Sequence, residues 1–315
     1  MIAALAGGVG AARMLSGLAS AIEPSQITAV VNTGDDTIMH GLHVSPDLDT
    51  VTYTLAGMIN PETGWGLSGE TWSAMEQLRA YSGNRLGWFN LGDKDLGTHL
   101  YRTTRLAEGA SLSQVTAEVA RRWGVRVRLL PMSDSRVETR VLVKDEQGTT
   151  EDIAFQEYFV ARRHSVEVAG VRFAGVEEAT AAPGVIEVIE QADEIVICPS
   201  NPIVSIGPVL STGGIGEAVA SRRDDCVAVS PIIAGRALKG PADRMLAELG
   251  HEPSVIGVAR MWAPYASTLV IDEADRALAD QVEASGMRPV VAPTVMSGTA
   301  ESTALAMIVL QAARR

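Results

Sequence analysis

The chain has 315 residues, of which 46% are hydrophobic and 4% aromatic, and its formal net charge is −12. This apolar content suffices for one large domain or two smaller ones, and the acidic balance excludes the basic surface that nucleic-acid binding requires. Because no apolar run approaches the roughly 20 residues that span a bilayer, and the N-terminus lacks a signal-peptide pattern, we expect a cytoplasmic protein with no membrane partner.

The first 32 residues carry the pattern of a βαβ unit. Residues 2–6 form a short apolar run, the glycine-rich stretch GGVGAAR follows, residues 11–22 have apolar side chains at helical spacing, and residues 27–32 form a second apolar run. A crossover helix between two such strands implies that they are parallel. The sequence therefore predicts a Rossmann-like, doubly wound α/β fold with a mainly parallel sheet.

Residues 61–184 depart from this pattern and predict a mixed α+β insertion. Amphipathic spacing indicates helices, with Ser111 as a candidate cap, and alternating runs indicate strands. The predicted elements are helices over residues 69–81 and 111–123, strands over 125–132 and 139–145, and a hairpin turn over 145–150 leading into residues 151–160.

Alternation of strand and helix returns in the last third of the chain. We assign residues 1–60 and 185–315 to one Rossmann-like domain. Cys198 and Cys226 are too few for a disulfide framework, so we expect both to be reduced and buried. The predicted elements are strands over residues 194–200, 226–233 and 267–272, and helices over 241–250, 273–285 and 298–314.

The first glycine loop is a candidate phosphate site. Gly7, Gly8 and Gly10 allow the backbone to approach a phosphate, the following helix presents free N–H groups, and Arg13 in its first turn adds a charge. The spacing is not that of a dinucleotide fingerprint, and no GK[ST] of a P-loop follows. An ordinary strand-to-helix turn explains this loop equally well.

A second loop follows the buried strand that ends near residue 199. Ser200 and Asn201 are helix-capping residue types, and Pro202 suits a first helical turn. We expect Ser205 to face a diphosphate. Ligands of open α/β sheets bind at the carboxyl ends of the strands, where both loops would lie. An ordinary capped helix is the alternative, but two such loops together favour a nucleotide site.

Three pairs of aspartates lie in predicted loops, each bordered by glycine or proline. Any single pair is best explained as a turn or a helix cap. Three pairs without cysteine suit a hard cation such as Mg²⁺ bound to phosphate oxygens, so we predict metal-assisted phosphate chemistry. The pairs are Asp35 and Asp36, Asp47 and Asp49, and Asp93 and Asp95.

The aromatic side chains cluster in one part of the insertion. Trp65, Trp72, Trp88 and Phe89 lie within 25 positions of one another, beside the acidic segments. Packing in a local core is the default explanation, and one wall of a pocket for a flat ring is the alternative. Zinc and serine-nucleophile chemistry are not supported, because the histidines have no zinc-ligand spacing and no GxSxG occurs.

Several long segments, in order from residue 5 to about residue 242, resemble the 2-phospho-L-lactate transferase family of coenzyme F420 biosynthesis. They are LAGGVGAARML, VNTGDD, HGLHVSPDLDTVTYTLAG, GWG, ETW, WFNLGDKDLGTH, LLPMSD, FQEYFV, PSNPIVSIGPVL and SPIIAGRALKGPA.

This resemblance implies a Mg²⁺-dependent transferase, usually a homodimer. Its donor is a guanosine diphosphate ester of a small acid such as lactate or enolpyruvate, and its acceptor is the deazaflavin Fo (7,8-didemethyl-8-hydroxy-5-deazariboflavin). The phospho-acid moves to the ribityl hydroxyl of Fo, and GMP is released. Residues 1–60 and 185–315 would bind the donor, and residues 61–184 would contribute to the deazaflavin site.

The family roles carry over to specific positions. Asp49 matches an Fo-binding aspartate near the reacting centre, and Lys94 stands where the family usually has arginine, so the planar bidentate fork is lost there. Asp49 and Lys94 are therefore the catalytic candidates, and with Trp65 and Trp88 the acceptor-binding candidates. Asp35 and Asp49 are the metal candidates, supported by Asp36 and Asp47. The two loops at residues 7–13 and 200–205 match the donor side.

Two other classes of protein are alternatives to this transferase. An NAD-dependent oxidoreductase is disfavoured by the glycine spacing. A guanine-nucleotide-binding regulatory protein of Rossmann-like fold without transferase activity is the alternative function. The small acid of the donor stays open among lactate, enolpyruvate and glycerate.

Overall fold

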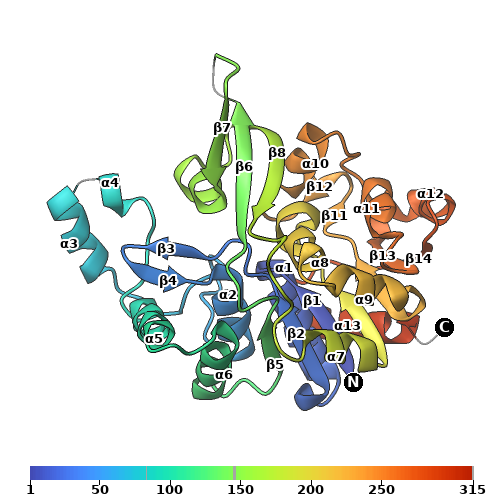
Figure 1. Ribbon diagram of the computed structural model, residues 1–315. Helices are drawn as coiled ribbons and strands as arrows, with labels where there is room; N and C mark the ends of the chain where they lie inside the picture. The colour runs from blue at the N-terminus through green and yellow to red at the C-terminus, as the bar shows by residue number, and fades with distance from the viewer. Residues whose placement is uncertain (83, 145–146, 314–315) are drawn as a thin grey trace.

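A seven-stranded parallel sheet forms the centre of the computed structural model, which describes residues 1–82, 84–144 and 147–313 (Figure 1). The strand order is β14-β13-β10-β9-β1-β2-β5, so the chain winds outward in one direction from β1 and in the other from β9. This confirms the predicted doubly wound α/β fold. The strands are β1 Ile2–Ala6, β2 Ile27–Val31, β5 Arg128–Pro131, β9 Glu194–Ile197, β10 Cys226–Val229, β13 Thr268–Asp272 and β14 Arg288–Ala292.

Both faces of this sheet are covered, because alternate side chains of each strand enter two separate cores. In β1, Ala3 and Leu5 belong to one core, and Ile2, Ala4 and Ala6 belong to the other. Burial on both sides explains why the strands read as unbroken apolar runs. One face packs on α7 Val185–Gln191, α8 Gly207–Ser211, α9 Ile215–Ser221, α10 Ala242–Glu248, α11 Val255–Trp262 and α12 Ala279–Ala284; the other packs on α1 Val9–Ala21, α2 Pro46–Leu55, α6 Leu112–Arg122 and α13 Thr299–Ala313.

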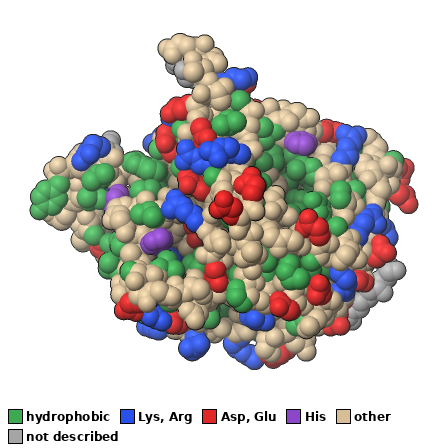
Figure 2. Space-filling view, viewed as in Figure 1, with side chains coloured by type: hydrophobic (Ala, Val, Ile, Leu, Met, Phe, Trp, Pro, Cys, Tyr) green, Lys and Arg blue, Asp and Glu red, His purple; other side chains and the backbone are tan. Residues whose placement is uncertain are grey.

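The predicted insertion contains a second sheet, which rises above the central one in Figure 1. Its antiparallel order is β7-β6-β8, with β6 Glu138–Lys144, β7 Thr150–Ala154 and β8 Glu167–Ala174. A further group of elements forms an arm on the left of Figure 1, over which hydrophobic side chains gather in Figure 2, whereas the short hairpin of β11 Ile232–Ile233 and β12 Arg236–Ala237 lies on the right. The arm consists of the hairpin β3 Thr37–Met39 and β4 Leu42–Val44, α3 Ser73–Ser82, α4 Asn84–Gly87 and α5 Asp95–Ala107.

Several predicted boundaries were wrong. The strand expected within the insertion at 125–132 is β5, an edge strand of the central sheet that pairs with β2. The strand-like segment 151–160 is extended only in its first half, since Glu157–Ala161 forms a π-helical turn. The predicted helix 273–285 begins with a 3₁₀ turn at Glu273–Leu278 before α12. Residues 145–146 of the predicted hairpin turn and residue 314 of the last predicted helix lie outside the described residues.

Other local predictions are confirmed. Ser111 caps α6, and its hydroxyl accepts a hydrogen bond from the Gln114 backbone N–H in a capping box. Cys198 and Cys226 are free and buried in opposite cores. Burial raises the pKa of the Cys198 thiol to about 12. None of the helices in the described part of the chain is long and apolar enough to cross a membrane.

The contact between α1 and α13 depends on Gly17. A Cβ at this position would overlap the Ser302 carbonyl, whereas a Cβ on Gly97 in α5 would meet nothing within 4 Å. We predict that Gly17→Ala lowers the free energy of unfolding by about 1–3 kcal/mol through overpacking. Gly97→Ala, the matched control, should raise it by roughly 0.5–1 kcal/mol through helix propensity. Urea unfolding measures both; equal effects would contradict the close packing.

Candidate functional site

The strand order reverses between β1 and β9, and the two predicted loops meet there. In doubly wound sheets ligands bind outside the carboxyl ends of the strands at this position. The Gly7 backbone N–H donates to Ser200 Oγ at 3.3 Å, and a Cβ on Gly7 would lie 2.5 Å from Ser205 Cβ. A Cβ on Gly10 would overlap the Pro199 carbonyl oxygen. The glycines therefore allow the two loops to pack against each other.

The second loop begins with the cap that the sequence predicts. Asn201 Oδ1 accepts hydrogen bonds from the backbone N–H groups of Ile203 and Val204, at 2.9 and 3.4 Å. Pro202 is the first residue of the π-helical turn Pro202–Ile206, which leads directly into α8. Seven of the eight predicted donor residues thus lie together at the end of β1 and β9.

Arg13 is the exception among these eight residues. Since α1 begins at Val9, Arg13 lies in the second helical turn, not the first. Its guanidinium donates to the Met296 carbonyl oxygen at 2.8 Å and so stabilises the segment before α13. A contact between Arg13 and a phosphate stays a prediction.

Carboxylates from the end of β2 and the start of α2 lie beside the glycine loop. The Asn32 side-chain amide donates to Asp35 Oδ1 at 3.2 Å and to Asp47 Oδ2 at 2.9 Å, so these two carboxylates are close together. A Cβ on Gly8 would lie 2.5 Å from Asp47 Oδ1. Ser45 Oγ donates to Asp36 Oδ2 at 2.6 Å. We call Asp35, Asp36 and Asp47 the acidic cluster.

The prediction that Asp47 and Asp49 lie in a loop was wrong. They occupy the first turn of α2, where Pro46 begins the helix and acidic side chains interact favourably with the helix dipole. Side chains two apart on a helix point in different directions. Asp47 accordingly faces Asn32, whereas Asp49 faces α5.

Burial makes the acidic cluster costly to ionise. Loss of hydration, with repulsion from Asp47 and Asp36, raises the pKa of Asp35 well above its usual value. Burial likewise raises the pKa of Asp36 well above its usual value and that of Asp47 to about 6. Within the described residues, Asp36 Oδ1 and Thr33 Oγ1 have no hydrogen-bond partner. The cluster therefore favours an added cation.

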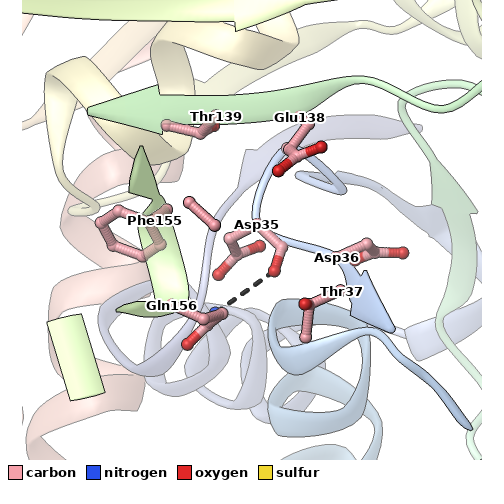
Figure 3. A pocket seen from close by; sticks show the side chains of 9 residues that line it. Asp35, Asp36, Thr37, Glu138, Thr139, Phe155 and Gln156 are labelled. Atoms are coloured by element: carbon pink, nitrogen blue, oxygen red, sulfur yellow. Dashed lines mark hydrogen bonds between the residues drawn. The ribbon is translucent and has the colours of Figure 1, made fainter. Parts of the chain in front are cut away.

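The sheet of the insertion, β7-β6-β8, contacts the loop that carries Asp35 and Asp36, which we call the acidic loop (Figure 3). The Thr139 backbone N–H of β6 donates to the Gly34 carbonyl at 2.6 Å, and Gln156 Nε2 donates to the Asp35 carbonyl at 3.2 Å. A cavity of about 10 Å³, room for one water molecule, lies between the loop and the sheet. The backbone of the acidic loop is thus fixed by residues far away in the sequence.

Asp49 is held by residues that the sequence analysis did not assign to the site. Arg102 Nη1 donates to Asp49 Oδ2 at 3.1 Å, and Arg102 Nη2 pairs with Asp49 Oδ1. His99, set aside for want of a zinc pattern, lies 3.3 Å from Arg102 Nη1 through Nδ1 and 3.2 Å from Asp95 Oδ2 through Nε2. The spacing of Asp95, His99 and Arg102 on one helical face was the available sequence signal.

The third acidic pair and Lys94 have other roles in the structure. Asp93 accepts hydrogen bonds from Thr71 Oγ1 and from the backbone N–H groups of Ser73 and Ala74, and these bonds lower its pKa. It therefore caps α3. Lys94 is exposed, and its Nζ donates to the Ser68 carbonyl at 2.9 Å. It lines a separate cleft of about 450 Å³ between α5 and α6, on a different face of α5 from Arg102.

The two tryptophans predicted to bind the acceptor lie in different surroundings. Trp65 is 51% exposed in the loop 60–66, where a Cβ on Gly64 would lie 3.3 Å from Val9 Cγ1. That loop therefore borders the glycine loop. Trp88 instead packs edge-on against Phe89, with ring centroids 5.7 Å apart, beside the small core of the arm.

The predicted metal ligands Asp35 and Asp49 have different hydrogen-bond partners. Both oxygens of Asp49 are occupied by Arg102, and the carboxylate close to Asp35 is Asp47. The described residues contain no group of three or more His, Cys, Asp or Glu arranged to hold a metal ion. Mg²⁺ commonly needs only one or two carboxylates, because water and substrate phosphates supply the other ligands. Asp35 and Asp47 fit that requirement.

Known proteins resemble this chain over almost its whole length. A model of the family described as 2-phospho-L-lactate transferase CofD matches residues 2–306. A protein of Streptomyces griseus named phosphoenolpyruvate transferase is 46% identical, covering 99% of this chain and 98% of its own. One of the same name from Mycolicibacterium smegmatis is 42% identical, covering 96% of each.

Solved structures support the fold alone. A member of the UPF0052 family from Bacillus halodurans has a TM-score of 0.61 at 17% identity, with 98% of each chain covered. A second structure of a protein from the same organism has a TM-score of 0.63 at 18% identity.

The raised pKa of Asp47 predicts a pH-dependent gain of stability in Asp47→Asn. Folding raises the pKa of Asp47 from 3.8 to about 6, so the folded protein is stable with Asp47 protonated below about pH 4. This stability is lost as the pH rises through about 6 and Asp47 ionises in its buried position. Without divalent ions, Asp47→Asn should therefore be more stable than wild type by on the order of 3 kcal/mol at pH 7.5, with a small difference at pH 4. Urea unfolding at both pH values, with exposed Asp280→Asn as control, measures this; a pH-independent difference would contradict it.

A metal ion at Asp35 and Asp47 would stabilise the folded state by mass action. We expect MgCl₂ to raise the melting temperature of the wild type in the presence of GDP, and Asp35→Asn to abolish most of that shift. Asp280→Asn should keep it. If MgCl₂ raised the melting temperature of Asp35→Asn as much as that of the wild type, the ion would not bind at Asp35.

Proposed function

This chain belongs to the 2-phospho-L-lactate transferase family, and we propose that it transfers a phospho-acid from a guanosine diphosphate ester to the ribityl hydroxyl of the deazaflavin Fo in coenzyme F420 biosynthesis. GMP is the second product. The named relatives favour phosphoenolpyruvate as the transferred group, because those at 42–47% identity are phosphoenolpyruvate transferases.

The observation that carries the proposal is the convergence of the two glycine-bordered loops with the acidic cluster. The N-terminus of α1, which has no side-chain cap, would bind the diphosphate of the donor together with Ser200 and Ser205. Mg²⁺ held by Asp35 and Asp47 would offset the negative charge that develops on the departing GMP. Positioning and electrostatics would supply most of the rate enhancement.

The transfer itself is an in-line displacement. The ribityl oxygen forms a bond to the phosphorus nearer the small acid, and the bond from that phosphorus to the bridging oxygen breaks, leaving its electron pair on GMP. The proton that the hydroxyl loses leaves with GMP or passes to water. Asp49, at the start of α2, orients the attacking hydroxyl. The bidentate contact with Arg102 occupies both of its carboxylate oxygens, which favours an orienting role over that of a metal ligand.

Mass spectrometry of the products tests this function. Purified protein, Fo and MgCl₂ should be mixed separately with the guanosine diphosphate esters of enolpyruvate, lactate and glycerate. We expect the deazaflavin to gain the mass of one phosphoenolpyruvyl group from the first donor, with equimolar GMP. Binding of guanine nucleotide without any mass gain would favour the regulatory alternative instead.

A further inference from the structure

Arg102 is the only lysine or arginine that is buried in the described part of the chain, with 3% of its surface exposed. Its two terminal nitrogens meet the two oxygens of Asp49, which is also buried. Nη1 additionally contacts the His43 carbonyl at 3.4 Å. This two-point contact joins α5 to the first turn of α2, and it defines the plane of the Asp49 carboxylate.

Behind Arg102 lies a chain of three side chains, of which His99 and Tyr53 are buried and Asp95 is half-buried. His99 lies between Arg102 Nη1 and Asp95 Oδ2, and Asp95 Oδ1 accepts a hydrogen bond from Tyr53 Oη at 2.6 Å. Burial raises the pKa of Tyr53, which keeps its phenol protonated as the donor to Asp95. Trp123 packs edge-on against Tyr53, with ring centroids 5.5 Å apart. The guanidinium is therefore held on two sides, by the carboxylate and by the imidazole.

We infer that Arg102 is a positioning residue for the transfer reaction, which fixes the Asp49 carboxylate so that it orients the acceptor hydroxyl. This inference rests on the proposed function. A buried ion pair adds little net stability compared with well-packed apolar side chains, but the planar fork of arginine constrains direction in a way that lysine cannot. Arg102 also neutralises Asp49, so that an anionic donor can approach the neighbouring acidic cluster with less repulsion.

A double-mutant cycle tests this role. Wild type, Arg102→Lys, Asp49→Asn and the double variant are assayed for transfer to Fo, with the folded fraction of each measured by circular dichroism. We expect Arg102→Lys to lower kcat on the order of 100-fold, the loss typical of a displaced reactive group, while KM for the donor changes less than about twofold. In the Asp49→Asn background, Arg102→Lys should lower kcat little further, because the two residues act as one unit.

Arg105→Lys is the matched control. Arg105 lies on the same helix but pairs at the surface with Glu108 and Glu118, so its variant should retain wild-type kcat. Arg102→Ala supplies a second readout, since added guanidinium ion should restore part of its activity and ethylammonium should not.

Three results would overturn the positioning role: wild-type kcat in Arg102→Lys, losses that multiply independently in the double variant, or activity that follows only the folded fraction. An inactive wild-type protein would overturn the proposed function as well. An active wild type with an unaffected Arg102→Lys variant would overturn the role of Arg102 alone.

Discussion

The main constraint on the candidate site is that several buried carboxylates lie close together at one edge of a parallel sheet. Burial raises the pKa of Asp35, Asp36 and Asp47, and repulsion from neighbouring carboxylates adds to the rise at Asp35 and Asp36. The Asn32 amide and the start of α2 offset part of this cost. A diphosphate alone would add to the repulsion, whereas a cation between carboxylate and phosphate would reduce it. The proposed metal ion would therefore allow a phosphate to approach the cluster.

Elements outside the central sheet supply the supports for this arrangement. The insertion sheet binds the backbone of the acidic loop through Thr139 and Gln156. Helix α5 supplies Arg102, which pairs with Asp49 and leaves Asp47 free to face the glycine loop. A nucleotide-type sheet by itself would provide the loops at residues 7–10 and 200–205 but none of these contacts. The insertion thus supports the acidic residues, which themselves come from residues 35–49.

Sequence reasoning was most successful where local chemistry decides structure. The apolar runs, the glycine loop and the caps at Ser111 and Asn201 are local signals, and each lies where it was expected. It was less successful for charged residues, because a carboxylate can cap a helix, bind a metal or pair with an arginine. Asp93 turned out to be a cap, and Arg13 binds a carbonyl some 280 positions away in the sequence.

By itself, the sequence determined the fold class, the two loops that follow β1 and β9, and the family, because periodicity, glycine positions and long ordered motifs are all local properties of the chain. Only the tertiary structure decided which aspartates are neighbours. Asp47 joins Asp35 through the shared Asn32 amide, and Asp49 joins Arg102. The direction of each side chain follows from how α2 begins and how α5 packs against it, and these depend on contacts between distant segments that no short stretch of sequence encodes.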